Sequence, residues 1–250
     1  MSKLTKDNIV TVFNSIYEKV NNGIPRISPP VEEFADEYLK KYKAKQLAAK
    51  AMQNTQVAKC TTSGFLSGFG GWLTLPVSIP ANLSSVLYVQ MRMIAATAYM
   101  GGFDLKDDQV QTFVYACLAG VSVNQVIKKF GVQFGNKIAL KGIEKIPGKI
   151  LVKINQKIGF RFLTKFGEKG MVNLWKLVPV VGAVVNGGLD LAETKIVAAR
   201  AYKMFIEKDF SVGEELQLEE LTDDDLVAVD EMQETQQSGE AQETGNNDVS

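Results

Sequence analysis

Histidine is absent from the sequence, and only two cysteines are present, Cys60 and Cys117. Histidine is the side chain most used for proton transfer near neutral pH and is the commonest metal ligand. Its absence excludes serine triads with a histidine base and zinc sites that contain histidine. The two cysteines lie too far apart for a zinc-ligand spacing, so we expect free thiols in the core, no disulfide framework, and no metal or cofactor.

Two further sequence signals are missing. No GxxxxGK[ST] loop is present, and the GFGG glycines at 68–71 lack the lysine and hydroxyl group that would hold phosphate and magnesium. Residues 1–10 include Lys3, Lys6 and Asp7 and contain no apolar run of signal-peptide length. We therefore expect neither a nucleotide loop nor export through a signal peptide, and we expect a cytoplasmic protein.

The formal net charge is zero, but the charges are divided unequally along the chain. The segment Glu214–Ser250 holds 13 acidic residues and no lysine or arginine, whereas residues 1–213 hold all 28 basic residues and the other 15 acidic ones. The low apolar content of the acidic segment predicts a disordered tail. The basic part should bind polyanions: an anionic lipid surface, a nucleic acid, or the tail itself.

Apolar residues in the first 59 positions recur with the spacing of amphipathic helices. The first helix carries its apolar stripe at Ile9, Val12, Phe13, Ile16, Tyr17 and Val20. We expect it to end at Gly23 and Pro25, and we expect a second helix to begin at Ser28 and run to about Lys59. A further helix is predicted over about Asp107–Phe130, so the pattern favours an all-α fold.

The stretch from Cys60 to Met91 contains 32 consecutive uncharged residues. A membrane-spanning helix needs roughly 20 apolar residues, but Pro76 and Pro80 divide this stretch into shorter pieces. We expect either a buried helical hairpin or a re-entrant or interfacial hairpin, and a true span is the least favoured alternative.

A shift of 103 residues aligns the sequence with itself. Trp72 then falls on Trp175, and Pro76 falls on Pro179. The match predicts two repeat units, about 64–104 and 167–207, each with a Gly-bearing apolar arm, a Trp, a Pro break and an Ala-rich helix. Convergence of two similar helical hairpins is the alternative. A Trp at the end of an apolar arm suits a membrane interface or a core.

Basic residues recur at every fourth position between the two units: Lys137, Lys141, Lys145, Lys149, Lys153, Lys157, Arg161, Lys165 and Lys169. They flank apolar residues at Ile150, Ile154, Ile158, Phe162 and Phe166. This ladder is typical of a basic amphipathic helix that attaches to an anionic leaflet, with Trp72 and Trp175 as further membrane contacts. It is equally compatible with a solvated helix that packs on the core through its isoleucines. Nucleic acid is less favoured, because no stacking aromatics accompany the lysines.

The segments GFLSGFGGWLTLPVSIPANL, Leu87–Gly102 and EKGMVNLWKLVPVVGAVVNGGLDLAETKIVAARAY resemble the EcsC protein family of bacteria. The resemblance covers roughly Lys43 to Phe205. The family takes its name from a protein encoded beside an ABC transporter, so the resemblance implies a bacterial setting and a membrane transporter as one kind of partner. It implies no catalytic activity. Asn82 stands where family members often have an acidic residue, which argues against acid chemistry there.

One polar constellation lies in an apolar setting: Asn173, Lys176, Asp190, Thr194 and Arg200. A single helix would place Asp190 and Thr194 four residues apart on one face. This set is a candidate site, and a hydrolase that works without histidine would use Asp190, Thr194 and Lys176. The alternative is hydrogen bonding between helices inside the bundle.

Together these patterns predict an all-α protein with a single helical bundle, two pseudo-repeated Gly/Pro-broken hairpins and a disordered acidic tail. The expected parts are N-terminal amphipathic helices (1–59), an EcsC-like helical domain (60–213) with basic linker helices (136–166), and the tail (214–250). We expect a non-enzymatic protein at the inner face of the membrane, accessory to a transporter or an envelope process. A soluble protein–protein interaction module and the hydrolase are the alternatives.

Overall fold

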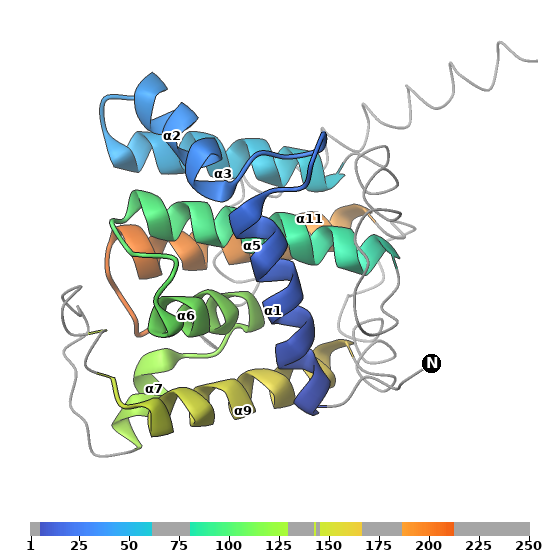
Figure 1. Cartoon of the computed structure of the whole chain (residues 1–250), viewed down its shortest axis with the longest axis vertical. Coiled ribbons are helices and arrows are strands. Elements are labelled where there is room, and N and C mark those ends of the chain that lie inside the picture. Colours follow the sequence, from blue (N-terminus) through green and yellow to red (C-terminus); the bar gives the residue numbers. More distant parts are fainter. Residues whose placement is uncertain (1–5, 62–80, 130–142, 144–145, 167–186, 213–250) are drawn as a thin grey trace, which may run out of the picture.

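The computed structural model describes residues 6–61, 81–129, 143, 146–166 and 187–212. These residues contain helices and no strand, which confirms the predicted all-α fold. With the labels of Figure 1, the α-helices are α1 (Lys6–Asn22), α2 (Val31–Lys41), α3 (Lys45–Thr61), α5 (Ala81–Met100), α6 (Asp108–Ala119), α7 (Val123–Lys128), α9 (Gly148–Phe166) and α11 (Gly187–Ala201). A π-helical turn, η1 (Tyr202–Ile206), continues α11.

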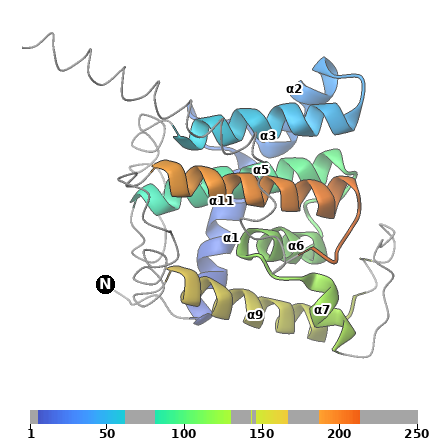
Figure 2. The same cartoon turned by 180° about the vertical axis from the view of Figure 1, so that it is seen from behind.

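The helices are stacked in layers, and one helix crosses the stack (Figures 1 and 2). The pair α2 and α3 forms one end, α5 and α11 form the middle, α6 follows, and α7 and α9 form the other end. Helix α1 runs across the layers and contacts both α5 and α9. The apolar residues that these helices bury belong to one continuous core.

Helix α1 crosses the stack through the stripe that its sequence predicts. Its six predicted stripe residues are all buried. Gly23 ends the helix with φ +76°, and a Cβ there would come within 2.7 Å of the Ser28 carbonyl oxygen. Glycine is the residue that tolerates both this left-handed conformation and this close approach, so the sequence-based end point is confirmed.

The single helix predicted from Ser28 to Lys59 is wrong, because the structure has two helices there. Tyr42 adopts an extended conformation and ends α2, and α3 begins at Lys45. The apolar spacing continues in phase from Phe34 through Ala49 and contains no Gly or Pro, so the sequence shows no sign of the break. Tertiary packing decides it, since α2 and α3 contact each other and also contact α5.

Helix α5 is the central element of the bundle, and apart from half-buried Tyr99 its residues from Ser84 to Met100 are buried. This burial includes the C-terminal part, Ser84–Met91, of the long uncharged stretch, and it favours the buried hairpin for that part. Residues 62–80, with both prolines and Trp72, lie outside the described residues. Trp175 and the first part of the second repeat unit also lie outside them, so the repeat stays a prediction.

The helix predicted over Asp107–Phe130 is also wrong, because it is divided into α6 and α7. Gly120 ends α6 in the left-handed conformation, with φ +69°. Ser122 then caps α7, and its side chain accepts a hydrogen bond from the Gln125 amide. A glycine at the end of one helix and a serine before the next are standard boundary signals, so this break was readable in the sequence.

After η1 the chain turns back toward α6 and α7. Phe210 packs among Phe103, Phe113 and Phe205, with ring centroids 5.3–6.4 Å apart. The described chain ends at Val212, which is buried. None of the described helices combines the length and the apolar composition that a membrane crossing requires.

Candidate functional site

Helix α9 has one face in the core and one face in solvent. Ile150, Ile154, Ile158 and Phe162 are buried, and α1, α6 and α7 pack on the helix. These four residues of the predicted apolar stripe therefore pack on the bundle, as in the alternative of a helix packed on the core, and the side chain of Phe166 lies outside the described residues. Any surface function of α9 has to come from its other side.

The solvent side of α9 combines lysines with exposed apolar groups. We call the exposed residues Lys149, Val152, Lys153, Gln156 and Phe160 the α9 outer face. Val152 is 55% exposed and Phe160 is 54% exposed. Among the described residues, Leu47 is the other large apolar residue that is exposed. A spacing of three or four residues brings all five onto one side of a helix, with the two apolar groups about 12 Å apart.

The predicted ladder of basic residues winds out of this face. Each step of four residues turns about 40° around a helix, so three steps turn about 120°. Accordingly Lys149 and Lys153 are exposed, whereas Lys157 and Arg161 are half-buried. Lys137, Lys141, Lys145 and Lys169 lie outside the described residues, as does the side chain of Lys165. Of the described ladder residues, the first two are the ones most open to a partner.

The layer of α7 and α9 is basic. Neither helix contains Asp or Glu, and Lys128 and Lys129 at the end of α7 are exposed. Together with Lys149 and Lys153 they give this end of the bundle four exposed lysines. The ladder did not include Lys128 and Lys129, and the apolar members of the outer face were also missed. The two apolar residues could have been found from the sequence, because Val152 and Phe160 recur in phase with Lys149 and Lys153 and out of phase with the isoleucines.

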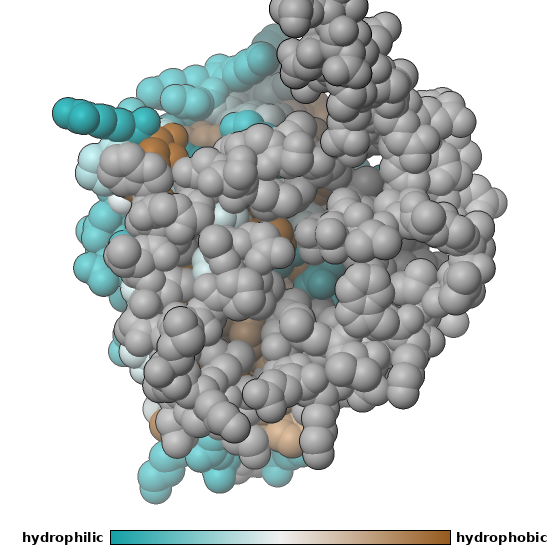
Figure 3. All heavy atoms as spheres, turned by 90° about the vertical axis from the view of Figure 1, so that its right-hand side faces the viewer, coloured by the Kyte–Doolittle hydropathy of each residue, from teal (hydrophilic) through white to brown (hydrophobic). Residues whose placement is uncertain are grey.

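A second group of exposed lysines lies at the other end of the stack, where α2 turns into α3. We call it the α2–α3 turn, and it consists of Lys40, Lys41, Lys43, Lys45 and Lys50, with Leu47 among them. Figure 3 shows hydrophilic side chains along both the upper and the lower edges of the described part. The turn differs from the α9 outer face, because α2 also carries Glu32, Glu33, Asp36 and Glu37. Glu37 is three and four residues from Lys40 and Lys41, where opposite charges offset each other.

The polar constellation predicted from the sequence is only partly described. Asn173 and Lys176 lie outside the described residues, and Asp190 belongs to α11 but its side chain is not described. Thr194 is fully buried, and its Oγ1 accepts a hydrogen bond of 3.0 Å from Gln90 Nε2 of α5. The described part of this constellation therefore includes a contact between two helices.

Arg200, the other described member, is buried against the end of α6. Its Nη1 donates a 2.9 Å hydrogen bond to the Cys117 carbonyl oxygen. Burial lowers the pKa of the guanidinium from its usual range. The carbonyl end of α6 carries partial negative charge, which favours a cation there. Burial also raises the pKa of the Cys117 thiol to about 12, and this free buried thiol confirms the expected core cysteine. The side chain of Cys60 is not described.

Other buried polar groups link α3 to its neighbours. Gln53 Nε2 donates to Thr97 Oγ1 at 3.1 Å and to the Ala198 carbonyl oxygen at 3.0 Å. One side chain of α3 thus connects α5 and α11. Buried polar groups need such partners, and these bonds fix the relative positions of the three helices. Among the described residues, no group of three or more Cys, Asp and Glu side chains could hold a metal ion.

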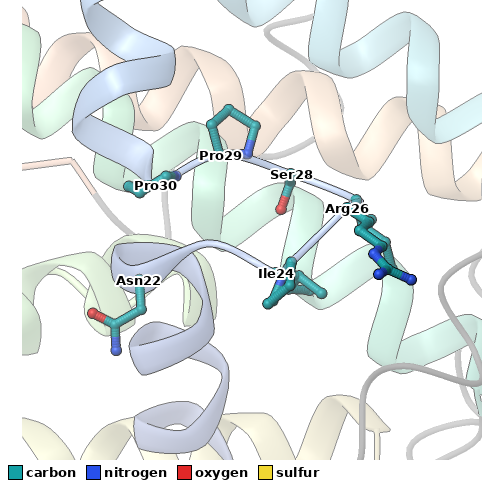
Figure 4. A pocket seen from close by; sticks show the side chains of 8 residues that line it. Asn22, Ile24, Arg26, Ser28, Pro29 and Pro30 are labelled. Carbon is teal, nitrogen blue, oxygen red and sulfur yellow. The ribbon is translucent and has the colours of Figure 1, made fainter.

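A hollow of about 460 Å³ lies at the loop between α1 and α2 (Figure 4). All of its lining residues come from one segment, Asn22 and Ile24–Pro30. The loop is held to α5, because Ser28 Oγ and the Tyr88 hydroxyl share a 2.6 Å hydrogen bond and Arg92 Nη2 donates to the Pro29 carbonyl oxygen at 3.2 Å. Arg26 is the one charged residue of the lining, so the hollow brings few chemical groups together.

Comparison with protein-family models gives a match to the EcsC protein family over residues 28–206. The match covers more than half of the chain and includes α2 to α11 and η1, but it excludes α1. No curated protein and no solved structure matches the chain. The family assignment therefore rests on the family model.

Proposed function

We propose that this chain, which belongs to the EcsC protein family, attaches peripherally to an anionic membrane surface through the α9 outer face. One observation carries the proposal: Val152 and Phe160 are more than half exposed on the same helix side as Lys149 and Lys153. Apolar groups that project between lysines suit the boundary between lipid headgroups and acyl chains. We place the attachment at the inner face of the membrane, where the leaflet carries negative charge.

The expected binding is weak and reversible. Each lysine near an anionic leaflet contributes about 1 kcal/mol, so the four exposed lysines of α7 and α9 would contribute about 4 kcal/mol. Burial of the exposed halves of Val152 and Phe160 would add about 1 kcal/mol each. A total of about 6 kcal/mol corresponds to an association constant on the order of 10⁴ M⁻¹, close to that of a single myristoyl chain.

Charge should dominate this attachment, so it should respond strongly to salt. The screening length is about 10 Å at 0.1 M salt and about 3 Å at 1 M salt. The apolar contribution alone, about 2 kcal/mol, is too small to hold the protein on lipid. We therefore expect binding to anionic vesicles at low salt and release at high salt, with little binding to neutral vesicles.

Flotation with phosphatidylglycerol-containing liposomes tests the proposal. The double variant Lys149→Gln with Lys153→Gln should lower the partition coefficient about 30-fold, because two contributions of about 1 kcal/mol are lost. The matched control is Lys43→Gln with Lys45→Gln, which removes the same charge from the α2–α3 turn and should change partition less than threefold. A wild-type protein that stays at the bottom of the gradient at low salt, with and without residues 214–250, would refute the proposal.

The alternatives give different results in the same experiment. A soluble interaction module would bind a protein partner, such as a transporter subunit, and would not float with pure lipid. A hydrolase that uses Asp190, Thr194 and Lys176 would lose activity on Thr194→Val without any change in flotation. No observation on the described residues favours a soluble interaction module or a hydrolase over membrane attachment. Membrane attachment is therefore the function that we propose.

A further inference from the structure

The last described residues, which precede the acidic segment in sequence, lie beside the basic layer of α7 and α9. Ser122 Oγ, at the start of α7, donates to the Ser211 carbonyl oxygen at 3.1 Å, and the Asn124 amide donates to the Phe210 carbonyl oxygen at 3.2 Å. These bonds fix the last described residues against α7, which packs on α9. The last described residues therefore lie beside α7, at the end of the stack that also contains α9 and opposite the end formed by α2 and α3 (Figures 1 and 2).

The composition of this segment complements the α9 outer face in two ways. Glu214–Glu234 contains ten acidic residues and no Lys or Arg. It also contains aliphatic side chains at Leu216, Leu218, Leu221, Leu226, Val227 and Val229. The outer face offers lysines and the exposed side chains of Val152 and Phe160. The segment and the outer face thus carry opposite charges, and both contain apolar groups.

The segment is also long enough. Helix α9 has 19 residues and so measures about 28 Å. The 21 residues of 214–234 span about 30 Å as a helix and about 70 Å when fully extended, so either conformation can cover α9. Because only Gly213 separates the segment from Val212, its effective concentration at α9 is in the millimolar range.

We propose that Glu214–Glu234 binds the α9 outer face of its own chain and competes with anionic lipid for it. The inference rests on the proposed function, because it names the regulation of the same surface. At an effective concentration of about 1 mM, a contact with an intrinsic dissociation constant of about 0.1 mM occupies the face about 90% of the time. Lipid binding is then weakened about tenfold.

The contact can be tested without lipid, on the full chain, with a zero-length carbodiimide that joins carboxylates to nearby lysines. In the monomer band we expect cross-links from Lys149 or Lys153 to residues 214–234. The internal control is the pair Lys43 and Lys45, which are also exposed and should give few such links. Cross-links spread evenly over both pairs, or absent from α9, overturn the inference.

The competition is tested by flotation of a full-length variant in which the ten acidic residues of 214–234 are changed to the matching amides. We expect about tenfold stronger binding to anionic liposomes. The control variant changes Glu240, Glu243 and Asp248 to amides and should bind like the wild type. If the amide variant binds lipid more strongly but the wild type forms no cross-links to Lys149 or Lys153, the membrane repels the acidic segment in general. That result would overturn the inference.

The two proposals fail separately. If the wild type and the amide variant float equally well, the competition is refuted and membrane attachment stands. If neither floats but the cross-links form at Lys149 and Lys153, membrane attachment is refuted and the contact remains, without its competing ligand.

Discussion

Removal of the apolar groups from the α9 outer face should weaken membrane binding without loss of stability. The change is Val152→Ser combined with Phe160→Ser. Full burial of a Val or Phe side chain is worth about 1.5–3 kcal/mol, and just over half of each residue is exposed, so burial against lipid would contribute about 1 kcal/mol for each. The loss of about 2 kcal/mol should reduce the partition coefficient on anionic liposomes about 30-fold.

Stability separates this effect from unfolding. Surface substitutions usually change the free energy of unfolding by less than about 0.5 kcal/mol, so the thermal midpoint of the double variant should stay within a few degrees of the wild type. Leu47→Ser is the matched control, because Leu47 is 57% exposed but lies at the α2–α3 turn. The reasoning is refuted if the double variant partitions like the wild type, or if Leu47→Ser weakens binding as much.

Three further predictions concern the interior. Gly120→Ala should lower the free energy of unfolding by about 1–2 kcal/mol, because the alanine must adopt the left-handed conformation and its Cβ would lie 3.2–3.3 Å from the Arg200 guanidinium. Urea unfolding measures this loss, and an equal loss in an Arg200→Met background would show that the contact with Arg200 does not contribute. Thr194→Val should lower the free energy of unfolding by about 1–3 kcal/mol, because it leaves the buried Gln90 amide without the hydroxyl oxygen that accepts its hydrogen bond. Unchanged stability in urea unfolding would contradict that bond. In a Cys60→Ser background, Cys117 should resist thiol reagents at pH 8 until urea unfolds the chain, and rapid labelling of the native protein would argue against its burial. The free energy of unfolding should fall above about pH 9, because the Cys117 thiol then ionises in the unfolded chain but not in the folded one.

The local sequence pattern was sufficient to predict the structure where one regular face of a helix packs on the bundle. The stripe of α1, from Ile9 to Val20, is buried as its spacing predicts, and Gly23 ends the helix as expected. These features depend on residues close in sequence, since helical periodicity and glycine conformation are local properties. The family resemblance was likewise carried by local motifs and is confirmed by the match over residues 28–206.

Tertiary packing determines the features of the fold that the local sequence pattern did not predict. The turn between α2 and α3 interrupts an apolar spacing that continues in phase, so only the joint packing of both helices on α5 determines it. The break at Gly120 and Ser122 was readable, but the uncharged run from Gln109 to Ile127 suggested one buried helix. For α9, the sequence pattern left open whether the isoleucines face lipid or the core, and in the structure Ile150, Ile154 and Ile158 are buried in the bundle. The α9 outer face was predicted in part: Lys149 and Lys153 belong to the predicted ladder, whereas the exposed apolar residues Val152 and Phe160 were missed.

The most direct test of the account is the position of Phe160 relative to lipid. In a Cys60→Ser background, a bimane label would be attached to Phe160→Cys or, as the control, to Leu47→Cys, and the full chain would be bound to anionic vesicles whose acyl chains carry a nitroxide quencher. The account predicts strong quenching of the label at position 160 and little at position 47. Bound protein whose label at position 160 is not quenched, or is quenched no more than the label at position 47, would contradict it.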